Sequence, residues 1–469
     1  MKRLLIKLIK TINGYYVFDA NYNCISEISQ YQYDCLHKMI QNKRVNDTEC
    51  TCISEMLNKK IISDHEIEKI ENFYTRFLDD VLDRSIEKMT LQVTQACNLR
   101  CSYCIYSDMK TVSNQRSHGN QKMTWDIAKK AVDFLMYHSV DTKKVNIGFY
   151  GGEPLLNFSL IKKIIQYIST TYAGKDVSYA ITTNGTLLTD DVITFFEKNK
   201  VQLTISMDGP EEIHDINRRY ALDGKGSYKD VLENTRKFFA RHPKYFNEYV
   251  GLNMVLDPQF DYEKIQKFVS EGWVKNLSNV NTNIIDDSGG ITQNVYSENF
   301  VWKYIYCKFR SIFAYVRNPN TNLDSVEVRD LSSIYEFESR LVPMLYIPSI
   351  SAPSGPCIPG KNRLFVNING DFYPCERVSE VSENMNIGSV FKGFKLEQAA
   401  KLLNVGKITE KQCKNCWNFT YCLQCAKYAD ADNQLDEVRR LSNCERAKNG
   451  TEDNLRILIL RDEVRKYYE

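Results

Sequence analysis

Three cysteines, Cys97, Cys101 and Cys104, directly follow the strand-like run Met89–Thr94, and they constrain this chain more than any other feature. Their spacing keeps three sulfurs in one tight loop. Three thiolates can ligate three irons of a [4Fe–4S] cluster and leave the fourth iron open to another ligand. Such a loop is expected at the carboxyl end of a parallel strand, where β/α barrels place their chemistry. A zinc knot is the competing interpretation, because cytosolic CxxC patterns often bind zinc.

Strand-like and helix-like patterns alternate from Met89 onward. Strands are expected at VNIGFY, VSYAIT, VQLTIS and GLNMVL. Apolar residues at helical spacing predict helices over Leu160–Ile168 and Asp190–Asn199. Thr124 has the position of an N-cap before a further helix. This alternation predicts βαβ units and a parallel sheet.

Glycines and polar residues follow several of these predicted strands and are further candidates for a ligand site. Gly151, Gly152 and Glu153 follow VNIGFY, and Thr183 and Asn184 end the next strand. The two glycines allow the backbone to approach a ligand closely, and Glu153 offers an acceptor for a cationic amine. After VQLTIS comes Met-Asp-Gly-Pro, with a histidine and an arginine downstream.

The three-cysteine loop, Gly-Gly-Glu-Pro and Ser-Met-Asp-Gly-Pro together resemble the radical S-adenosylmethionine (radical SAM) enzymes. The resemblance implies an α/β fold with a partial (β/α)6 barrel. It also implies that S-adenosylmethionine binds the open iron and that one electron cleaves it to a 5′-deoxyadenosyl radical. Cofactor-binding roles are implied for Tyr103, Gly151, Gly152, Glu153, Thr183, Asn184, Ser206, Arg218 and Asn253. A surface position for Arg218, a structural role for Asn253 and a core position for Tyr103 are the alternatives, and no catalytic side chain is assigned.

Seven further cysteines gather near the C-terminus. They are Cys357, Cys375, Cys413, Cys416, Cys422, Cys425 and Cys444. Between the first two, Asn369-Gly370-Asp371 is typical of a type I′ hairpin turn. The two CxxC pairs are only five residues apart, whereas zinc ribbons separate theirs by roughly 15–20 residues.

This second group resembles the SPASM domain, which binds two auxiliary [4Fe–4S] clusters, so three clusters are expected in all. The resemblance implies an outer cluster on Cys413, Cys416, Cys422 and Cys444, and an inner cluster on Cys357, Cys375 and Cys425. The family usually has three residues, not two, before Cys425. Seven thiolates leave one iron open, and an open iron is thiophilic enough to take a substrate cysteine. Cys307 stands in an apolar segment and is expected in the core, although the sequence leaves open whether it is a ligand.

The first 85 residues form a separate pattern. LLIKLI, GYYVFD and NCISEI are expected strands, and helices are expected over Gln30–Ile40, Thr51–Leu57 and 64–82. This order suggests a winged-helix-like unit. A DNA-binding unit needs a basic surface. Residues 1–90 hold 13 Lys and Arg against 14 Asp and Glu, which disfavours DNA binding. The unit resembles the recognition element of enzymes that modify ribosomally made peptides (RiPPs), which implies binding of a precursor leader as an added strand.

The whole chain of 469 residues suits several domains, and its net charge of +2 favours neither nucleic acid nor a membrane surface as a partner. No apolar run approaches the ~20 residues of a membrane span, and no secretory signal is evident. A cytoplasmic protein is expected, in which 15 cysteines are not disulfides. The expected domains are 1–85 (leader binding), 86–310 (radical SAM core), 311–350 (bridging segment) and 351–469 (SPASM).

The family resemblance predicts a radical SAM maturase that forms thioether crosslinks in a ribosomal precursor peptide. The reaction would be a net two-electron oxidation, with an external electron donor such as flavodoxin or ferredoxin. A carbon–carbon crosslinking maturase and an anaerobic sulfatase-maturating enzyme are alternatives within the same fold. A non-catalytic iron–sulfur or zinc winged-helix regulator is the alternative from another class, but it gives Gly-Gly-Glu-Pro no role.

Overall fold

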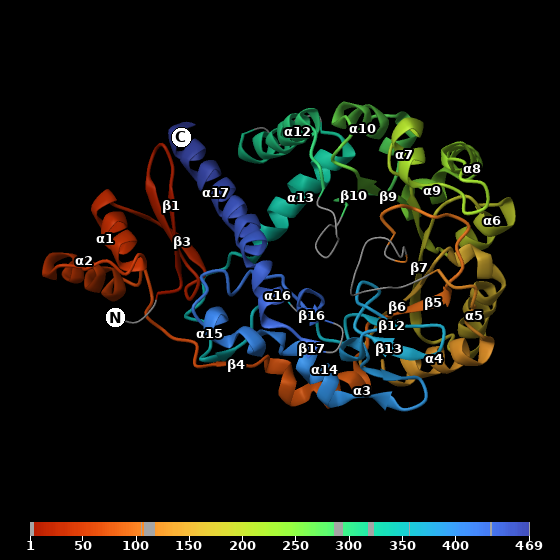
Figure 1. Ribbon diagram of the computed structural model, residues 1–469, viewed down its shortest axis with the longest axis horizontal. Helices are drawn as coiled ribbons and strands as arrows, with labels where there is room; N and C mark the ends of the chain where they lie inside the picture. The colour runs from red at the N-terminus through yellow and green to blue at the C-terminus, as the bar shows by residue number, and fades with distance from the viewer. Residues whose placement is uncertain are drawn as a thin grey trace.

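The computed structural model describes residues 4–104, 106, 118–285, 294–317, 323–355, 357–431 and 434–468. Figure 1 shows three parts side by side. A small N-terminal unit lies at one end, a barrel-like α/β part lies at the other, and the C-terminal chain fills much of the space between them.

Six parallel strands form the sheet of the barrel, in the order β10-β9-β8-β7-β6-β5. They are β5 (Lys88–Thr94), β6 (Lys144–Gly151), β7 (Asp176–Thr183), β8 (Gln202–Ser206), β9 (Val250–Leu256) and β10 (Asn279–Ile284). Because every neighbouring pair is parallel, all six carboxyl ends lie at one edge. The predicted α/β fold with a partial (β/α)6 barrel is confirmed.

Helices connect these strands and cover the outer side of the sheet (Figure 1). They are α4 (Trp125–Tyr137), α5 (Phe158–Thr171), α6 (Asp190–Lys198), α7 (Glu211–Asn217), α8 (Tyr228–Arg241), α9 (Pro243–Tyr249), α10 (Tyr262–Val269) and α11 (Gly272–Lys275), with a 3-10 turn η2 (Pro154–Asn157). The hydroxyl of Thr124 accepts a hydrogen bond from the Ile127 N–H, so its predicted N-cap role is confirmed. In α5, Ile161, Ile164 and Ile168 are buried in the barrel core, as their helical spacing predicts.

The sheet extends beyond β5 into the C-terminal chain, which the sequence did not indicate. β12 (Leu364–Val366) pairs in parallel with β5, and β13 (Asp371–Tyr373), β14 (Gly388–Ser389) and β15 (Gly393–Phe394) follow in antiparallel pairs. This pairing attaches the segment between the C-terminal cysteines to the barrel itself.

The turn between β12 and β13 differs from the predicted type I′ turn. A type I′ turn needs a positive φ at both central residues. Here Gly370 has a φ of +87°, but Asn369 is not among the residues with positive φ. The Gly370 N–H donates to the Asn367 carbonyl over 3.0 Å. The type I′ prediction is wrong because one left-handed glycine is enough to close this longer connection.

The N-terminal unit is a three-stranded antiparallel sheet followed by two helices. Its elements are β1 (Ile6–Lys10), β2 (Tyr15–Asp19), β3 (Cys24–Ile28), α1 (Gln30–Ile40) and α2 (Asp47–Asn58). Both helices begin with a capping box, at Ser29 and at Asn46. Leu36, Ile53 and Met56 are buried against one face of the sheet.

The helix predicted over 64–82 is wrong in extent. The chain there forms β4 (Lys69–Ile70), a 3-10 helix η1 (Phe73–Phe77) and only a short helix, α3 (Leu78–Arg84). β4 pairs in parallel with β11 (Ile350–Ser351), so strand pairing replaces helix in this stretch. Leu78 and Leu82 are buried in the barrel core, so α3 packs with the barrel.

The remaining elements belong to the middle part of the molecule. They are α12 (Glu298–Val316), α13 (Ser325–Arg340), η3 (Glu383–Met385), α14 (Leu396–Leu403), η4 (Val405–Thr409), α15 (Glu410–Cys413), η5 (Ala426–Ala429), β16 (Asp430–Ala431), β17 (Gln434–Leu435), α16 (Glu437–Ser442) and α17 (Cys444–Tyr468). Leu5 and Phe18 of the N-terminal unit share a buried cluster with Tyr421 and with Leu455 of α17. The N-terminal sheet is therefore packed on both faces.

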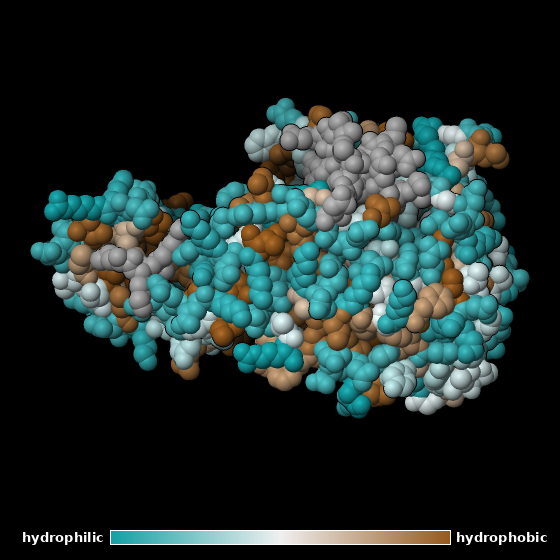
Figure 2. All heavy atoms as spheres, turned by 60° about the horizontal axis from the view of Figure 1, so that its bottom comes forward, coloured by the Kyte–Doolittle hydropathy of each residue, from teal (hydrophilic) through white to brown (hydrophobic). Residues whose placement is uncertain are grey.

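Hydrophilic side chains cover most of the face seen in Figure 2, where the N-terminal unit forms the narrower lobe. Within the described part of the chain, no helix combines the length and apolarity needed to cross a membrane.

Candidate active site

The three-cysteine loop follows β5 and is held by backbone hydrogen bonds to a second segment. The Arg100 N–H donates to the Arg219 carbonyl over 2.8 Å, and the Ser102 N–H donates to the Asn217 carbonyl over 3.1 Å. Within the loop, the Leu99 N–H points at the Cys97 sulfur over 3.4 Å. The positions of these cysteines are therefore fixed jointly by β5 and by the end of α7 with the residues that follow it.

The two glycines after β6 permit a close backbone contact with this loop. A Cβ at Gly151, which has a φ of +140°, would stand 2.0 Å from the Thr94 carbonyl oxygen, and one at Gly152 would stand 2.3 Å from that of Ala96. The Gly152 N–H donates to Thr94 (3.0 Å), and the Glu153 N–H donates to Ala96 (2.8 Å). The sequence suggested that these glycines admit a ligand, whereas the structure shows that they also join β6 to the cysteine loop.

Glu153 is fully buried beneath this contact. One carboxylate oxygen accepts from the Thr183 hydroxyl (2.7 Å) and the Leu155 N–H (3.0 Å), and the other accepts from the Asn184 N–H (2.7 Å). Burial raises the pKa of Glu153, while these hydrogen bonds act in the opposite direction. Through these hydrogen bonds, the Glu153 carboxyl group connects the end of β7 to the end of β6.

Asn184 connects the end of β7 to the cysteine loop. Its side-chain nitrogen donates to the Asn98 side-chain oxygen over 2.8 Å and lies 4.0 Å from the Cys97 sulfur. The Thr186 hydroxyl donates to the Asn184 oxygen and accepts from the Asn98 nitrogen. These contacts leave little freedom to the backbone around Cys97.

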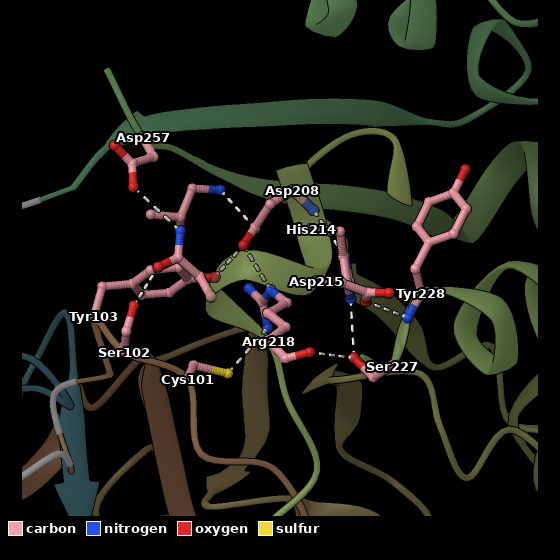
Figure 3. A network of polar contacts seen from close by, with 12 residues as sticks. Cys101, Ser102, Tyr103, Asp208, His214, Asp215, Arg218, Ser227, Tyr228 and Asp257 are labelled. Atoms are coloured by element: carbon pink, nitrogen blue, oxygen red, sulfur yellow. Dashed lines mark hydrogen bonds and ion pairs between the residues drawn. The ribbon is translucent and has the colours of Figure 1, made fainter. Parts of the chain in front are cut away.

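A buried ion pair lies on the other side of the loop (Figure 3). The Arg218 Nε donates to the Asp208 carboxylate over 2.8 Å, and both side chains are almost completely buried. The same carboxylate accepts from the Tyr103 hydroxyl and from the Val255 N–H (2.9 Å). The Arg218 guanidinium also lies over the Tyr103 ring at 5.5 Å, and one of its terminal nitrogens lies 3.9 Å from the Cys101 sulfur. Arg218 is therefore not a surface charge, and Asp208 is a partner that the sequence analysis did not single out.

His214 lies beside this pair, on the side away from Tyr103 (Figure 3). Its Nδ1 accepts from the Asp208 N–H (3.3 Å), so its Nε2 carries the proton toward the Ser227 hydroxyl (3.0 Å). Ser227 in turn donates to the Arg218 carbonyl (3.1 Å). Burial, with the nearby Arg218 charge, lowers the pKa of His214 to about 4, so the ring is neutral at physiological pH.

One cavity of about 370 Å³ brings the predicted residues together at the carboxyl edge of the sheet. It is lined by Cys97, Cys101, Cys104, Tyr103, Gly151, Gly152, Thr183, Asn184, Ser206, Arg218 and Asn253. Of the predicted cofactor residues only Glu153 does not line it. Eight further lining residues were not predicted from the sequence: Leu99, Tyr106, Tyr150, Thr182, Val255, Asn283, Ile284 and Ile285. Most of these stand at the ends of β6, β7, β9 and β10, so the rule that ligands bind at this edge of parallel strands could have found them.

Cys97, Cys101 and Cys104 bring three sulfur ligands to one cavity. In the described part of the chain, no three His, Cys, Asp or Glu side chains converge as ligands of one metal ion. Burial raises the pKa of Cys97 to about 12 and that of Cys101 to about 11. The positive charge of a bound iron–sulfur core would favour the ionised form of these thiols. The all-sulfur donor set, on a loop open to a ligand-sized cavity, fits a three-thiolate [4Fe–4S] cluster.

The described contacts link four of the C-terminal cysteines to one another and Cys375 to Cys425, but they place Cys357 with neither group. Cys413 and Cys422 both act electrostatically on Cys416, and Cys413 and Cys444 both act on Cys422. Burial raises the pKa of Cys416 to about 11. These four thiols therefore lie together.

Cys375 and Cys425 form a separate neighbourhood. Burial raises the pKa of Cys375 to about 11, and Glu376 and Cys425 add to this. Cys357 is exposed. Cys307 is buried in α12, where its sulfur accepts a hydrogen bond from the Gln266 side chain over 3.1 Å. The expected core position of Cys307 is confirmed.

Residues 91–271 match the family model of the Radical SAM superfamily. The chain contains a radical SAM domain. A cysteine-type anaerobic sulfatase-maturating enzyme of Clostridium perfringens is 24% identical over 346 residues, which are 70% of this chain and 85% of that protein. A solved structure described as native anSMEcpe with bound AdoMet has a TM-score of 0.59 at 20% identity, and the match covers 80% of this chain and 99% of that one. At this identity the likeness shows the fold.

The radical SAM cyclopropyl synthase TigE of Paramaledivibacter caminithermalis is 27% identical over 292 residues. The match covers 55% of this chain and 58% of that protein. The chain spans about half the length of this and other curated relatives. The homologues of the radical SAM domain thus include enzymes named for sulfatase maturation and for cyclopropyl synthesis.

Proposed function

We propose that this protein is a radical SAM maturase that joins a cysteine sulfur to a carbon of another residue in a ribosomally made precursor peptide. The observation that carries the proposal is the single cavity in which three cysteines meet the residues expected to bind S-adenosylmethionine. Cys97, Cys101 and Cys104 would hold the cluster. Arg218 and Ser206 would contact the carboxylate and ribose side of S-adenosylmethionine, and Glu153 would hold the ends of β6 and β7 in position.

The C-terminal cysteines would hold two auxiliary clusters. Cys413, Cys416, Cys422 and Cys444 would bind the outer one, and Cys357, Cys375 and Cys425 the inner one. The electrostatic neighbourhoods of Cys416, Cys422 and Cys375 support this division. With three protein thiolates, the inner cluster keeps one iron for the thiolate of the substrate, and the exposure of Cys357 is consistent with access from outside.

The precursor would be the peptide partner, and its leader would add a strand to the N-terminal sheet. The outer strands of that sheet are β1 and β3. Both outer strands contact α17, because the Lys10 carbonyl of β1 accepts from Arg456 (3.3 Å) and Glu27 of β3 pairs with Lys466 (2.5 Å). Because alternate amides of an added strand face the sheet, N-methylation of one alternate set of leader amides should abolish binding. Methylation of the other set should not. Equal effects of both sets would contradict strand addition.

The reaction is tested by incubating the reconstituted enzyme, S-adenosylmethionine, a flavodoxin or ferredoxin donor and a cysteine-containing precursor without oxygen. A thioether product has lost two hydrogen atoms and one thiol that iodoacetamide alkylates. A precursor that loses two hydrogens but keeps every thiol would instead support carbon–carbon bond formation, the candidate favoured by the cyclopropyl synthase relative. Oxidation of a single Cys or Ser without a crosslink would support a sulfatase-type maturase.

A further inference from the structure

Arg440 of α16 is a buried cation, and no carboxylate of the described residues pairs with it. Its side chain is 2% exposed. Its Nε donates to the Thr409 hydroxyl over 3.2 Å, and a terminal nitrogen donates to the Gln424 carbonyl over 3.4 Å. Both acceptors are neutral, and no carboxylate in the described ranges forms an ion pair with it. Arg218, the buried arginine of the barrel, is instead paired with Asp208.

A buried guanidinium without a counter-charge is costly, because it gives up the solvation that water provides. An apolar side chain of similar size would avoid this cost, so an arginine here calls for a negative group in contact range. Among the described residues, no carboxylate forms an ion pair with Arg440. Cysteines of the outer set lie instead just beyond Thr409 and Gln424, the residues that Arg440 contacts.

Each residue that accepts a hydrogen bond from Arg440 also lies close to a cysteine sulfur. The Thr409 hydroxyl lies 3.2 Å from the Cys413 sulfur. The Gln424 side-chain nitrogen lies 3.4 Å from the Cys444 sulfur. Arg440 also acts electrostatically on the Cys422 thiol.

A second cation near this set, Lys448, acts on Cys416 and Cys444. It is already paired with Glu445 over 2.9 Å and is partly exposed. Arg440 is therefore the deeper of the two positive charges beside the outer cysteines.

We propose that Arg440 is the counter-charge of an anionic iron–sulfur cluster held by Cys413, Cys416, Cys422 and Cys444, and that it raises the reduction potential of that cluster. The inference rests on the outer cluster of the proposed function. Four thiolates outweigh the positive charge of the iron–sulfide core, so the cluster is an anion. Reduction adds one electron, breaks no bond and makes the cluster more negative, and a nearby buried cation therefore favours the reduced form.

The test is a redox titration of the outer cluster in the full-length reconstituted protein, without peptide, followed by electron paramagnetic resonance. The outer signal is identified as the one that Cys416→Ala removes. Arg440→Gln should lower the equilibrium constant for reduction at least tenfold, which is 59 mV for one electron. Arg440→Lys should keep most of the wild-type potential. Lys411→Gln, which removes an exposed charge two residues before Cys413, should leave it unchanged because water screens that charge.

Thermal unfolding of the iron-free chain distinguishes this electrostatic role of Arg440 from a purely structural role. Arg440→Met should keep or raise the thermal midpoint of the iron-free chain, since it removes a buried charge, and should lower that of the reconstituted chain. Three results would each overturn the inference. The first is an equal loss of thermal midpoint in the iron-free and reconstituted chains of Arg440→Met, and the second is an unchanged reduction potential in Arg440→Gln. The third is wild-type protein that holds no outer cluster. Peptide product is assayed separately. A shifted potential without product contradicts the proposed function alone, and product with an unshifted potential contradicts the inference alone.

Discussion

Replacing Asp208 with Asn tests whether the buried ion pair organises the cavity. Asp208 is 1% exposed and Arg218 is 6% exposed, so the change leaves a positive charge in a site from which water is excluded. Removing one partner of a buried pair costs about 3–5 kcal/mol. The amide oxygen of Asn can still accept a hydrogen bond, which places the expected loss of unfolding free energy near the lower end, at about 3 kcal/mol.

The assay is thermal unfolding of the iron-free chain, followed by circular dichroism. For a unit of the size of the barrel, a loss of about 3 kcal/mol lowers the midpoint by roughly 6–12 °C. Asp190→Asn is the matched control, because it breaks the exposed pair with Arg241. An exposed pair contributes about 0–1 kcal/mol. The double variant Asp208→Leu with Arg218→Met should recover much of the loss, since no charge then stays buried.

Equal midpoints for Asp208→Asn and Asp190→Asn would refute the reasoning, because they would mean that water reaches Arg218. So would a double variant as unstable as the sum of the two single changes. Binding of S-adenosylmethionine, measured by calorimetry on the reconstituted protein, should weaken in Asp208→Asn, since Arg218 and Tyr103 both lose their common acceptor.

Three further predictions concern the same barrel and the C-terminal cysteines. The pKa of His214 in the folded chain, about 4, lies below its value in the unfolded chain. The neutral ring therefore contributes up to about 3 kcal/mol to the free energy of unfolding above pH 6.5, and this contribution is lost as the pH falls toward 4. In a plot of thermal midpoint against pH, His214→Gln should flatten the curve over this range. Gly152→Ala should reduce the iron bound by the cysteine loop, because its Cβ would meet the Ala96 carbonyl at 2.3 Å, while Gly174→Ala, with open space around it, should leave iron content unchanged. Cys307→Ala should keep its iron and Cys375→Ala should lose iron in a direct metal analysis, and iron loss in Cys307→Ala would make that residue a ligand.

The regular part of the barrel was predictable from the sequence because its signals are local. Apolar residues at helical spacing, such as Ile161, Ile164 and Ile168 of α5, lie on one face of a helix wherever that helix packs. Thr124 caps α4 through a hydrogen bond three residues away. Alternation of strands and helices fixes a parallel sheet, and the parallel sheet fixes the edge at which Cys97 and Ser206 meet.

The two wrong predictions, the helix over 64–82 and the type I′ turn, arose where local sequence preference competes with pairing between distant segments. The charged stretch 64–82 has helical composition, yet Lys69–Ile70 pairs with Ile350–Ser351. Asn369-Gly370-Asp371 is a frequent hairpin sequence, but the number of residues between the paired positions selected a turn with one left-handed glycine.

The sequence by itself determined the barrel, the cysteine loop and most of the cavity lining, because these depend on spacing along one continuous stretch. Only the tertiary structure decided which distant groups became partners. It joined β12 to β5 and gave Arg218 a buried acid. It also buried Arg440 against Thr409 and Gln424, which contact cysteine sulfurs, although arginine is usually exposed. The physical reason is that hydrogen-bond and charge partners are set by proximity in space, and proximity between residues far apart in the chain leaves no periodic trace in the sequence.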